Sequence, residues 1–189
     1  MQHKSDTVDI IFTTTERLMA RDGLHHLSIH KIAKEAGISP GTIYIHFENK
    51  EALLTRLIEN IFIRFETAMS QNFNLDDDPY HQYHRFWWNL WFEIQKCPET
   101  VLNFHQYRSL PGFCSLVQER TNNPNDPWNK FCEHAKAKGV LCDLPSQILF
   151  TISLDSAISL SVKTFYHNIT YPKSVLEQVV QQTWQAIKK

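Results

Sequence analysis

Residues 28–54 read SIHKIAKEAGISPGTIYIHFENKEALL, and this stretch predicts two short helices joined by a tight turn. Ser28 is a suitable N-cap for the first helix, and Gly37 suits a turn that needs a positive φ. Ser39 and Pro40 begin the second helix, because serine caps helices and proline is tolerated in their first turn. The side chains that can close a small core between the helices are Ile32, Ala33, Ile38, Ile43 and Phe47. Two short helices at this separation are typical of a helix-turn-helix motif.

The outward-facing residues of this motif can bind DNA. The start of the second helix is free to enter a major groove about 12 Å wide, where hydroxyls and backbone N–H groups meet base edges or phosphates. This part of the helix carries Ser39, Pro40, Gly41 and Thr42. Tyr44, His46 and Lys50 would flank the groove as phosphate donors, since phosphate contacts set the register and supply much of the affinity. His30 can join them from the first helix.

The same stretch closely resembles the DNA-binding domain of the TetR family of bacterial transcriptional regulators. The residues that carry the resemblance are Ser28, Ile32-Ala33, Ala36-Gly37-Ile38-Ser39, Gly41-Thr42, Tyr44, His46-Phe47 and Lys50-Glu51-Ala52-Leu53. The resemblance implies phosphate contacts for Thr42, Tyr44, His46 and Lys50. It implies base or backbone contacts for His30, Ser39, Pro40 and Gly41. Over the rest of the chain it extends only to the length, the helical pattern and a long helix that leaves the DNA-binding part.

Two features depart from the family pattern. Family members often carry more basic residues before the first helix and on the recognition helix, whereas here only Lys4 precedes the first helix and the recognition helix has no lysine or arginine. Reading of guanine by an arginine of this helix is therefore excluded, which leaves apolar contacts, hydroxyls, backbone groups and DNA shape. Residues 1–50 contain equal numbers of acidic and basic side chains, and the whole chain has a net charge of −1. The DNA-binding hypothesis thus depends on the motif and not on charge.

The composition is that of a globular protein, with 42% hydrophobic and 21% charged residues in a chain of 189. Few glycines and prolines interrupt apolar side chains spaced three and four residues apart, which predicts an all-α fold. The first helix can start at Asp6, and the helices after the motif are expected at 49–71, 80–96, 99–109, 112–121, 127–138, 145–168 and 172–188. The acidic segment 72–79 is expected to be a solvated loop. We expect a helix-turn-helix DNA-binding domain at 1–48 and a helical ligand-binding and dimerisation domain at 49–189.

Several classes of protein are excluded by missing signals. No segment approaches the roughly 18 apolar residues of a membrane span, and the N-terminus lacks signal-peptide features, so we expect a cytoplasmic location and no membrane partner. The cysteines lack CxxC spacing and are expected to be reduced core thiols: Cys97, Cys114, Cys132 and Cys142. No HExxH, GxSxG, P-loop or GxGxxG motif occurs, and the histidines are scattered. We therefore expect no enzyme, and no catalytic residue, metal site or cofactor.

Aromatic side chains gather in residues 80–92, YHQYHRFWWNLWF. They predict an aromatic-lined cavity for a small ligand, in agreement with the ligand-binding domain that the family resemblance implies, although a tightly packed core would give the same pattern. The candidate ligand-binding residues are Trp87, Trp88, Trp91, Phe104, Tyr107, Arg108, Phe113 and Asp155. Asp155 lies in an apolar run, where a buried carboxylate needs a partner. Its alternative position is at the solvent or at a dimer interface.

The last two predicted helices suit self-association. Residues 146–168 and 172–188 combine aliphatic side chains with small residues that allow helices to approach closely, so we expect a homodimer through these segments. A two-fold dimer would place two recognition helices about 34 to 36 Å apart, one turn of DNA. The alternative is that these apolar faces cover the core of their own chain.

The sequence thus predicts a transcriptional regulator, a repressor by preference, that binds a palindromic operator in double-stranded DNA as a homodimer. Its expected effector is a small lipophilic or aromatic molecule that releases it from the operator. Two alternatives stay open at this point. One is a carrier of hydrophobic ligands that uses the helix-turn-helix only as scaffold, and the other is a DNA-binding protein without a ligand.

Overall fold

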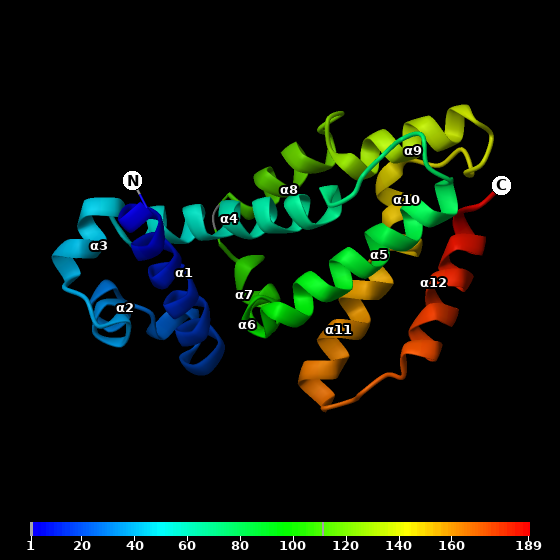
Figure 1. The fold of residues 1–189 in the computed structure, drawn as a ribbon. Coiled ribbons are helices and arrows are strands. Elements are labelled where there is room, and N and C mark those ends of the chain that lie inside the picture. Colours follow the sequence, from blue (N-terminus) through cyan, green and yellow to red (C-terminus); the bar gives the residue numbers. More distant parts are fainter. Residues whose placement is uncertain (1, 111) are drawn as a thin grey trace. The chain divides into compact units, whose positions relative to one another are not determined.

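The computed structural model describes residues 2–110 and 112–189, which form α-helices, one short 3-10 helix and connecting loops (Figure 1). The all-α prediction is therefore confirmed. Contacts divide the chain into two compact units, one formed by the residues up to Ile61 with Glu99–Leu116, the other by Phe62–Pro98 and Val117–Lys189. The functional boundary expected between residues 48 and 49 stays a prediction.

The first unit contains the helix-turn-helix. Its elements are α1 (Gln2–Asp22), the 3-10 helix η1 (Leu24–His26), α2 (Ile29–Ala36), α3 (Pro40–His46), the first part of α4 (Lys50–Ser70), most of α6 (Pro98–Leu102), α7 (Phe104–Tyr107) and the start of α8 (Phe113–Thr121). Helix α1 begins four residues before Asp6, whose side chain lies outside the described residues. Segment 99–116, far along the chain, thus belongs to the same unit as the motif.

Local capping interactions explain where the short helices begin and end. The Ser28 hydroxyl accepts a hydrogen bond from the Lys31 N–H at 3.3 Å, and Gly37 ends α2 in the left-handed region with φ 68°. The Ser39 hydroxyl accepts the Thr42 N–H at 3.1 Å and so caps α3. Each cap satisfies a backbone group that a helix end leaves without a partner. The predicted starts of both motif helices are therefore confirmed.

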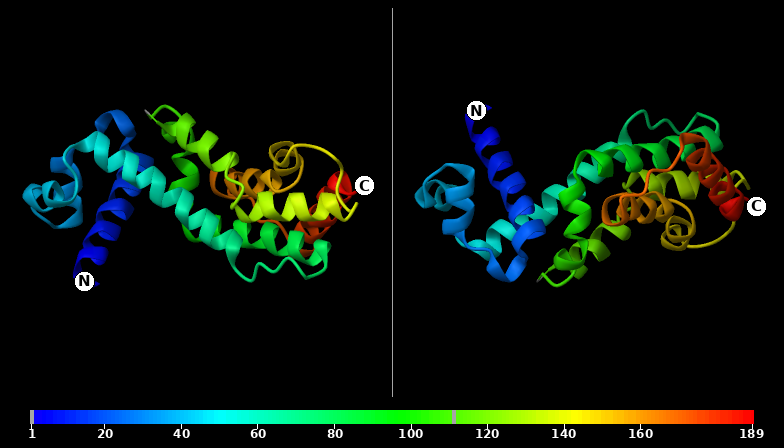
Figure 2. Two further views of the ribbon diagram at one scale, coloured as in Figure 1. Left: turned by 90° about the horizontal axis from the view of Figure 1, so that it is seen from above. Right: turned by 90° about the horizontal axis from the view of Figure 1, so that it is seen from below.

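The second unit is built around α5 (Pro79–Lys96), which packs against α11 (Asp155–His167) and α12 (Lys173–Ile187), as Figures 1 and 2 show. Helices α9 (Pro127–Ala137) and α10 (Ser146–Ile152) complete its core. All five helices contribute side chains that are at most 1% exposed, namely Trp87, Phe131, Leu149, Ala157 and Val180. The periodic apolar stripes of the sequence therefore meet in one hydrophobic cluster.

Two expected helices are each divided into two. The helix expected at 145–168 is interrupted at Ser153, whose hydroxyl donates to the Leu149 carbonyl while Ser156 donates to the Ser153 carbonyl at 2.6 Å. Side-chain bonds of this kind compete with the helical backbone bonds and bend or end a helix. The helix expected at 99–109 is divided at Asn103, whose side chain is fully buried and bonded to α1.

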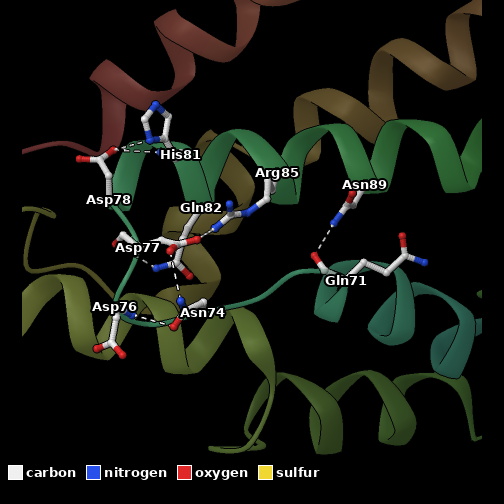
Figure 3. A network of polar contacts seen from close by, with 9 residues as sticks. All are labelled: Gln71, Asn74, Asp76, Asp77, Asp78, His81, Gln82, Arg85 and Asn89. Carbon is white, nitrogen blue, oxygen red and sulfur yellow. Dashed lines mark hydrogen bonds and ion pairs between the residues drawn. The ribbon is translucent and has the colours of Figure 1, made fainter.

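The acidic loop before α5 is ordered by its own side chains (Figure 3). Asp78 accepts the His81 N–H at 3.1 Å and caps α5, and Asp77 forms an ion pair with Arg85. Asn89 donates to the carbonyl of Gln71 at 3.2 Å and so joins α5 to the end of α4. Carboxylates at a helix N-terminus also interact favourably with the helix dipole. The loop is thus partly exposed, as expected, and it also fixes the start of the tryptophan-bearing helix.

Two expectations from the sequence are wrong. One is that no stretch approaches a membrane span, and the other is that all four cysteines are core thiols. The stretch Ser146–His167 is 22 residues long and contains an 18-residue window with a mean hydropathy of 1.4, so by length and hydropathy one stretch does reach the range of a membrane span. In the structure this stretch is interrupted at Ser153 and packs against α5. All four cysteines are free, but only Cys132 is a core thiol, since Cys114 is exposed and the other two are half-buried. Burial raises the pKa of the Cys132 thiol and keeps it protonated.

Candidate nucleic-acid interface

Helix α3 is held by a small core that leaves its opposite side in water. Ile32, Ala33, Ile43 and Phe47 are at most 4% exposed, whereas Ile38, also expected in this core, is half-buried. The ring of Phe47 packs against Phe12 of α1, with 5.7 Å between ring centroids. Packing on both α1 and α2 therefore fixes the direction in which α3 presents its other residues.

The structure brings all eight predicted DNA-contact residues together in the first unit. His30 lies on α2, Lys50 starts α4, and the others lie at or within α3. The exposed members are His30, Ser39, Gly41 and Tyr44. The partly exposed members are Pro40, Thr42, His46 and Lys50. None of the eight is buried in the core of the first unit.

The start of α3 offers hydroxyls and uncovered backbone. The hydroxyl oxygens of Ser39 and Thr42 lie 2.9 Å apart and hydrogen-bond to each other. A Cβ atom added to Gly41 would meet only the Ser39 hydroxyl, at an ordinary contact distance of 3.5 Å. Packing within the chain therefore does not require glycine at this position. A bare backbone here allows another molecule to approach α3 closely.

An arginine that precedes the motif in the chain is paired with carboxylates. Arg21, at the end of α1, forms ion pairs with Asp22 at 2.9 Å and Glu35 at 3.1 Å. Hydrogen bonds to both carboxylates raise the pKa of the guanidinium. The bond between Arg21 and Asp22 also lowers the pKa of Asp22. Phosphate binding by Arg21 would require breaking these pairs. Lys50 forms no such ion pair with any residue that the structure describes, which favours it as a phosphate donor.

A buried polar network in the first unit was missed from the sequence. Glu16 of α1 is 4% exposed, and its carboxyl group accepts hydrogen bonds from Thr100 at 2.5 Å and Tyr107 at 3.0 Å. Asn103 donates to the Glu16 carbonyl at 2.7 Å, and Gln106 donates to the Met19 carbonyl at 3.0 Å. Side chains of α6 and α7, together with Asn103 between them, thus tie this segment to α1. A glutamate within the apolar stripe of the first helix was the available signal.

The predicted ligand-binding residues fall in both units. Trp87, Trp88 and Trp91 lie on α5 in the core of the second unit. Trp87 and Trp91 stack at 9° with 5.6 Å between centroids, and the Trp87 N–H donates to Ser156 at 2.8 Å. The first unit holds the other predicted aromatic residues and the arginine, namely Phe104, Tyr107, Arg108 and Phe113. These residues therefore do not share one hydrophobic cluster with the tryptophans.

Individual members of this set differ from expectation in their surroundings. Tyr107 is buried with its hydroxyl bonded to Glu16, whereas Phe104 and Arg108 are exposed. Asp155 is only half-buried, so the expectation of a buried carboxylate is wrong. It lies in the first turn of α11, where the helix dipole favours a negative charge, and accepts a hydrogen bond from Ser159 at 3.4 Å. The role of these residues in ligand binding stays a prediction.

An aromatic residue that the prediction omitted is deeply buried beside these tryptophans. The hydroxyl of Tyr83 lies 2.6 Å from that of Thr183, and its ring packs 5.3 Å from that of Trp184. Burial raises the pKa of Tyr83 to about 12. The phenol therefore stays protonated near neutral pH and acts as a hydrogen-bonding group of the core.

Comparison with known proteins identifies the family of both parts of the chain. Residues 11–57 match the bacterial regulatory proteins of the tetR family, and residues 79–188 match the tetracyclin repressor-like C-terminal domain. The chain belongs to the TetR family. The resemblance seen in residues 28–54 is confirmed, and it extends to the second part of the chain.

Relatives cover the whole TetR-family chain. A helix-turn-helix transcriptional regulator of Haemophilus influenzae is 37% identical over 188 residues, which are 100% of this chain and 99% of the relative. The crystal structure of a TetR-family regulator from H. influenzae aligns over 100% of both chains with a TM-score of 0.90 and 38% identity. One from Vibrio parahaemolyticus covers 96% of this chain and 98% of its own, with a TM-score of 0.81 and 28% identity. The protein is thus a DNA-binding regulator of transcription.

The phosphate-contact assignment predicts the effect of two substitutions. Tyr44→Phe and Lys50→Ala should each weaken binding about three- to tenfold on all DNA sequences, because each removes one donor to a phosphate. Lys50→Ala should also reduce the slope of log affinity against log salt by about one for each lost contact. Fluorescence anisotropy with labelled duplexes at several salt concentrations measures both effects. Lys130→Ala, an exposed lysine of α9, is the control, and unchanged affinity at matched salt would remove a residue from the contact set.

Proposed function

We propose that this TetR-family protein is a cytoplasmic repressor that binds a palindromic operator as a homodimer and leaves it when a small lipophilic or aromatic ligand binds. The observation that carries the DNA-binding part is the set of eight exposed or half-exposed residues on α2, α3 and the start of α4. Their hydroxyls, phenol, imidazole and ammonium group have the chemistry of phosphate and base contacts.

Exposed apolar side chains support dimerisation through residues 146–168 and 172–188. Ile148, Ile152 and Tyr166 are between 41% and 50% exposed in the first segment, and Val175 is 41% exposed in the second. Exposed apolar side chains are unfavourable in water, and where they form one patch they are typical of a protein interface. A dimer also tethers two recognition helices, so that the second binds at a high effective concentration.

The aromatic content of the second unit supports a lipophilic or aromatic ligand. Faces of tryptophan rings bind planar, lipophilic or cationic molecules. A fatty acid metabolism regulator of Bacillus subtilis is 33% identical over 72 residues, which are 38% of this chain. A fatty acid degradation regulator of Bacillus halodurans shares the fold with a TM-score of 0.75 at 18% identity over 94% of both chains. Regulators of this fold therefore include proteins named for the metabolism of lipophilic acids.

Release by ligand requires two arrangements of the protein with different affinities for the ligand. A ligand that binds the arrangement with the wrong spacing of recognition helices more tightly would shift the population away from the DNA-bound arrangement. A ligand with equal affinity for both arrangements would leave the DNA affinity unchanged.

Selection of duplexes from a random DNA library at about 0.15 M salt tests this function. We expect enrichment of a palindrome with half-sites about one turn apart, because two recognition helices of a symmetric dimer would bind equivalent sequences. Light scattering at micromolar concentration, run on the same sample, should give twice the mass of the chain.

Three results would contradict parts of the proposal. A monomer would remove the dimer. The selection is repeated with protein that has been unfolded and refolded to remove any bound ligand. If no sequence is enriched then, the carrier of hydrophobic ligands is favoured. Saturation with a tightly bound ligand that left operator affinity unchanged would contradict release by that ligand and favour a DNA-binding protein without an effector.

A further inference from the structure

One aliphatic side chain on α3 is almost fully in water. Ile45 is 74% exposed, the largest exposed fraction among the exposed large apolar residues that the structure describes. Ile43, two positions earlier on the same helix, is fully buried in the core with α2. The neighbouring Tyr44 is 52% exposed. Ile45 therefore lies on the face of α3 that the motif core leaves uncovered.

The position of Ile45 on α3 relates it to the bare backbone at Gly41. Residues four apart share one face of a helix, and helical side chains lean toward the N-terminus over the preceding turn. Ile45 therefore shares one face of α3 with Gly41, where no side chain keeps another molecule away from the backbone. A duplex that approaches α3 closely enough to meet this backbone would also meet Ile45.

Its chemistry selects one kind of base edge. Isoleucine has no hydrogen-bond donor or acceptor, so against the N4 amino group of cytosine or the O6 atom of guanine it would leave a polar group without a partner. The major groove offers one apolar group, the C5-methyl of thymine. Because α3 has no lysine or arginine, a polar side chain of that kind does not compete for the same base.

We propose that Ile45 determines part of the DNA specificity by packing on the C5-methyl group of a thymine in each operator half-site. The inference rests on the proposed function, since it requires α3 to enter the major groove. Ile45 was not among the residues predicted to contact DNA, and it selects a base, whereas phosphate contacts at Tyr44 and Lys50 would act on every sequence.

The test removes the methyl groups from one symmetric pair of thymines at a time. At each position in turn, the thymine is replaced in both half-sites of the selected operator by deoxyuridine. Deoxyuridine keeps the base pair and lacks only the C5-methyl group. The affinities of the wild-type protein, Ile45→Ala and Ile45→Val are measured by fluorescence anisotropy at one salt concentration. Ile10→Ala, a 48% exposed isoleucine of α1 in the same unit, is the matched control.

We expect one symmetric pair of thymines at which deoxyuridine weakens wild-type binding about fourfold for each half-site, the contribution of one buried methyl-sized group. Ile45→Ala should lose this sensitivity at that pair only, while Ile45→Val and Ile10→Ala should keep it. Circular dichroism melting establishes that each variant is folded. Since Ile45 is exposed, its substitution should leave the melting temperature nearly unchanged.

The outcomes separate this inference from the proposed function. Operator binding by the wild type without sensitivity to any deoxyuridine, or equal sensitivity of wild type and Ile45→Ala, would overturn the role of Ile45 and leave the repressor proposal intact. A selected half-site without thymine would overturn it as well. Absence of sequence-specific binding by the wild type would overturn both.

Discussion

Replacement of Trp87 by alanine will lower the free energy of unfolding by about 3 to 5 kcal/mol, the usual cost of deleting a large buried aromatic side chain. Trp87 is fully buried, stacks on Trp91, contacts Trp88 edge-to-face and donates to Ser156. Alanine loses these contacts and leaves a cavity between α5 and α11, which rigid helices fill only in part. Urea unfolding followed by circular dichroism at 222 nm measures the change without depending on tryptophan fluorescence.

Two matched variants identify the origin of this loss. Trp87→Phe keeps an aromatic ring but removes the N–H donor to Ser156, so a smaller loss than that of Trp87→Ala is expected. Phe92→Ala removes a 54% exposed ring that stacks on Trp88, and a loss of about 1 kcal/mol is expected from that pair. If Trp87→Ala costs no more than Phe92→Ala, Trp87 is not the enclosed centre of this core.

Removal of the two hydroxyls that bind Glu16 will lower the free energy of unfolding by about 3 to 6 kcal/mol. In Thr100→Val with Tyr107→Phe, a 4% exposed carboxyl group loses two hydrogen bonds, and donors to such groups contribute about 1.5 to 3 kcal/mol each when the group is charged. Valine and phenylalanine keep the shape of the original side chains, so little of the effect comes from packing. Urea unfolding of the single and double variants measures it.

A double-mutant cycle assigns the effect to the carboxyl group. In a Glu16→Gln background, Tyr107→Phe should cost a different amount, with a coupling energy of about 0.5 to 3 kcal/mol. Ser109→Ala, on the exposed side of the same segment, should change stability by about 0.5 kcal/mol or less. Additive losses in the cycle would show that Tyr107 and Glu16 act independently and that the network does not hold α7 on α1.

The same network bears on how a signal could reach the DNA-binding unit. Helix α5, which carries the three tryptophans, is followed directly in the chain by α6 and α7. Side chains of α6, of α7 and of Asn103 between them bond to the α1 residues Glu16 and Met19. A displacement of the end of α5 would therefore act on a segment that is already part of the unit containing α3. If a ligand releases the protein from its operator, as we propose, the double variant should weaken that response.

Much of the candidate interface could be predicted because its signals are local. Ser28, Gly37 and Ser39 act on backbone groups within a few positions of themselves, so the sequence alone predicts where α2 and α3 begin and end. Spacing along a short helix then separates the buried Ile43 from the exposed Tyr44. The prediction missed Ile45, since a large aliphatic residue at that spacing was assigned to no face.

The candidate ligand site was less predictable because the aromatic content of a helix does not indicate which other helix packs against it. An apolar stripe identifies the face of a helix that is buried, but the helix that covers it can lie anywhere in the chain. Phe104 and Trp87 are both aromatic and lie 17 positions apart in the sequence, yet they belong to different compact units. Asp155 lies in an apolar run, yet the start of α11 gives its carboxylate access to water.

The all-α class, the caps of the helix-turn-helix, most of its small core and the family of the DNA-binding part follow from the amino-acid sequence alone. These features depend on helix propensity, capping and periodicity, all of which act over a few residues. The tertiary structure is needed to explain why one helix is divided at Asn103, because the Asn103 side chain bonds to the Glu16 carbonyl 87 positions earlier in the chain. It likewise decided that Glu99–Leu116 joins the unit of α3, since buried polar groups must find partners wherever the fold supplies them.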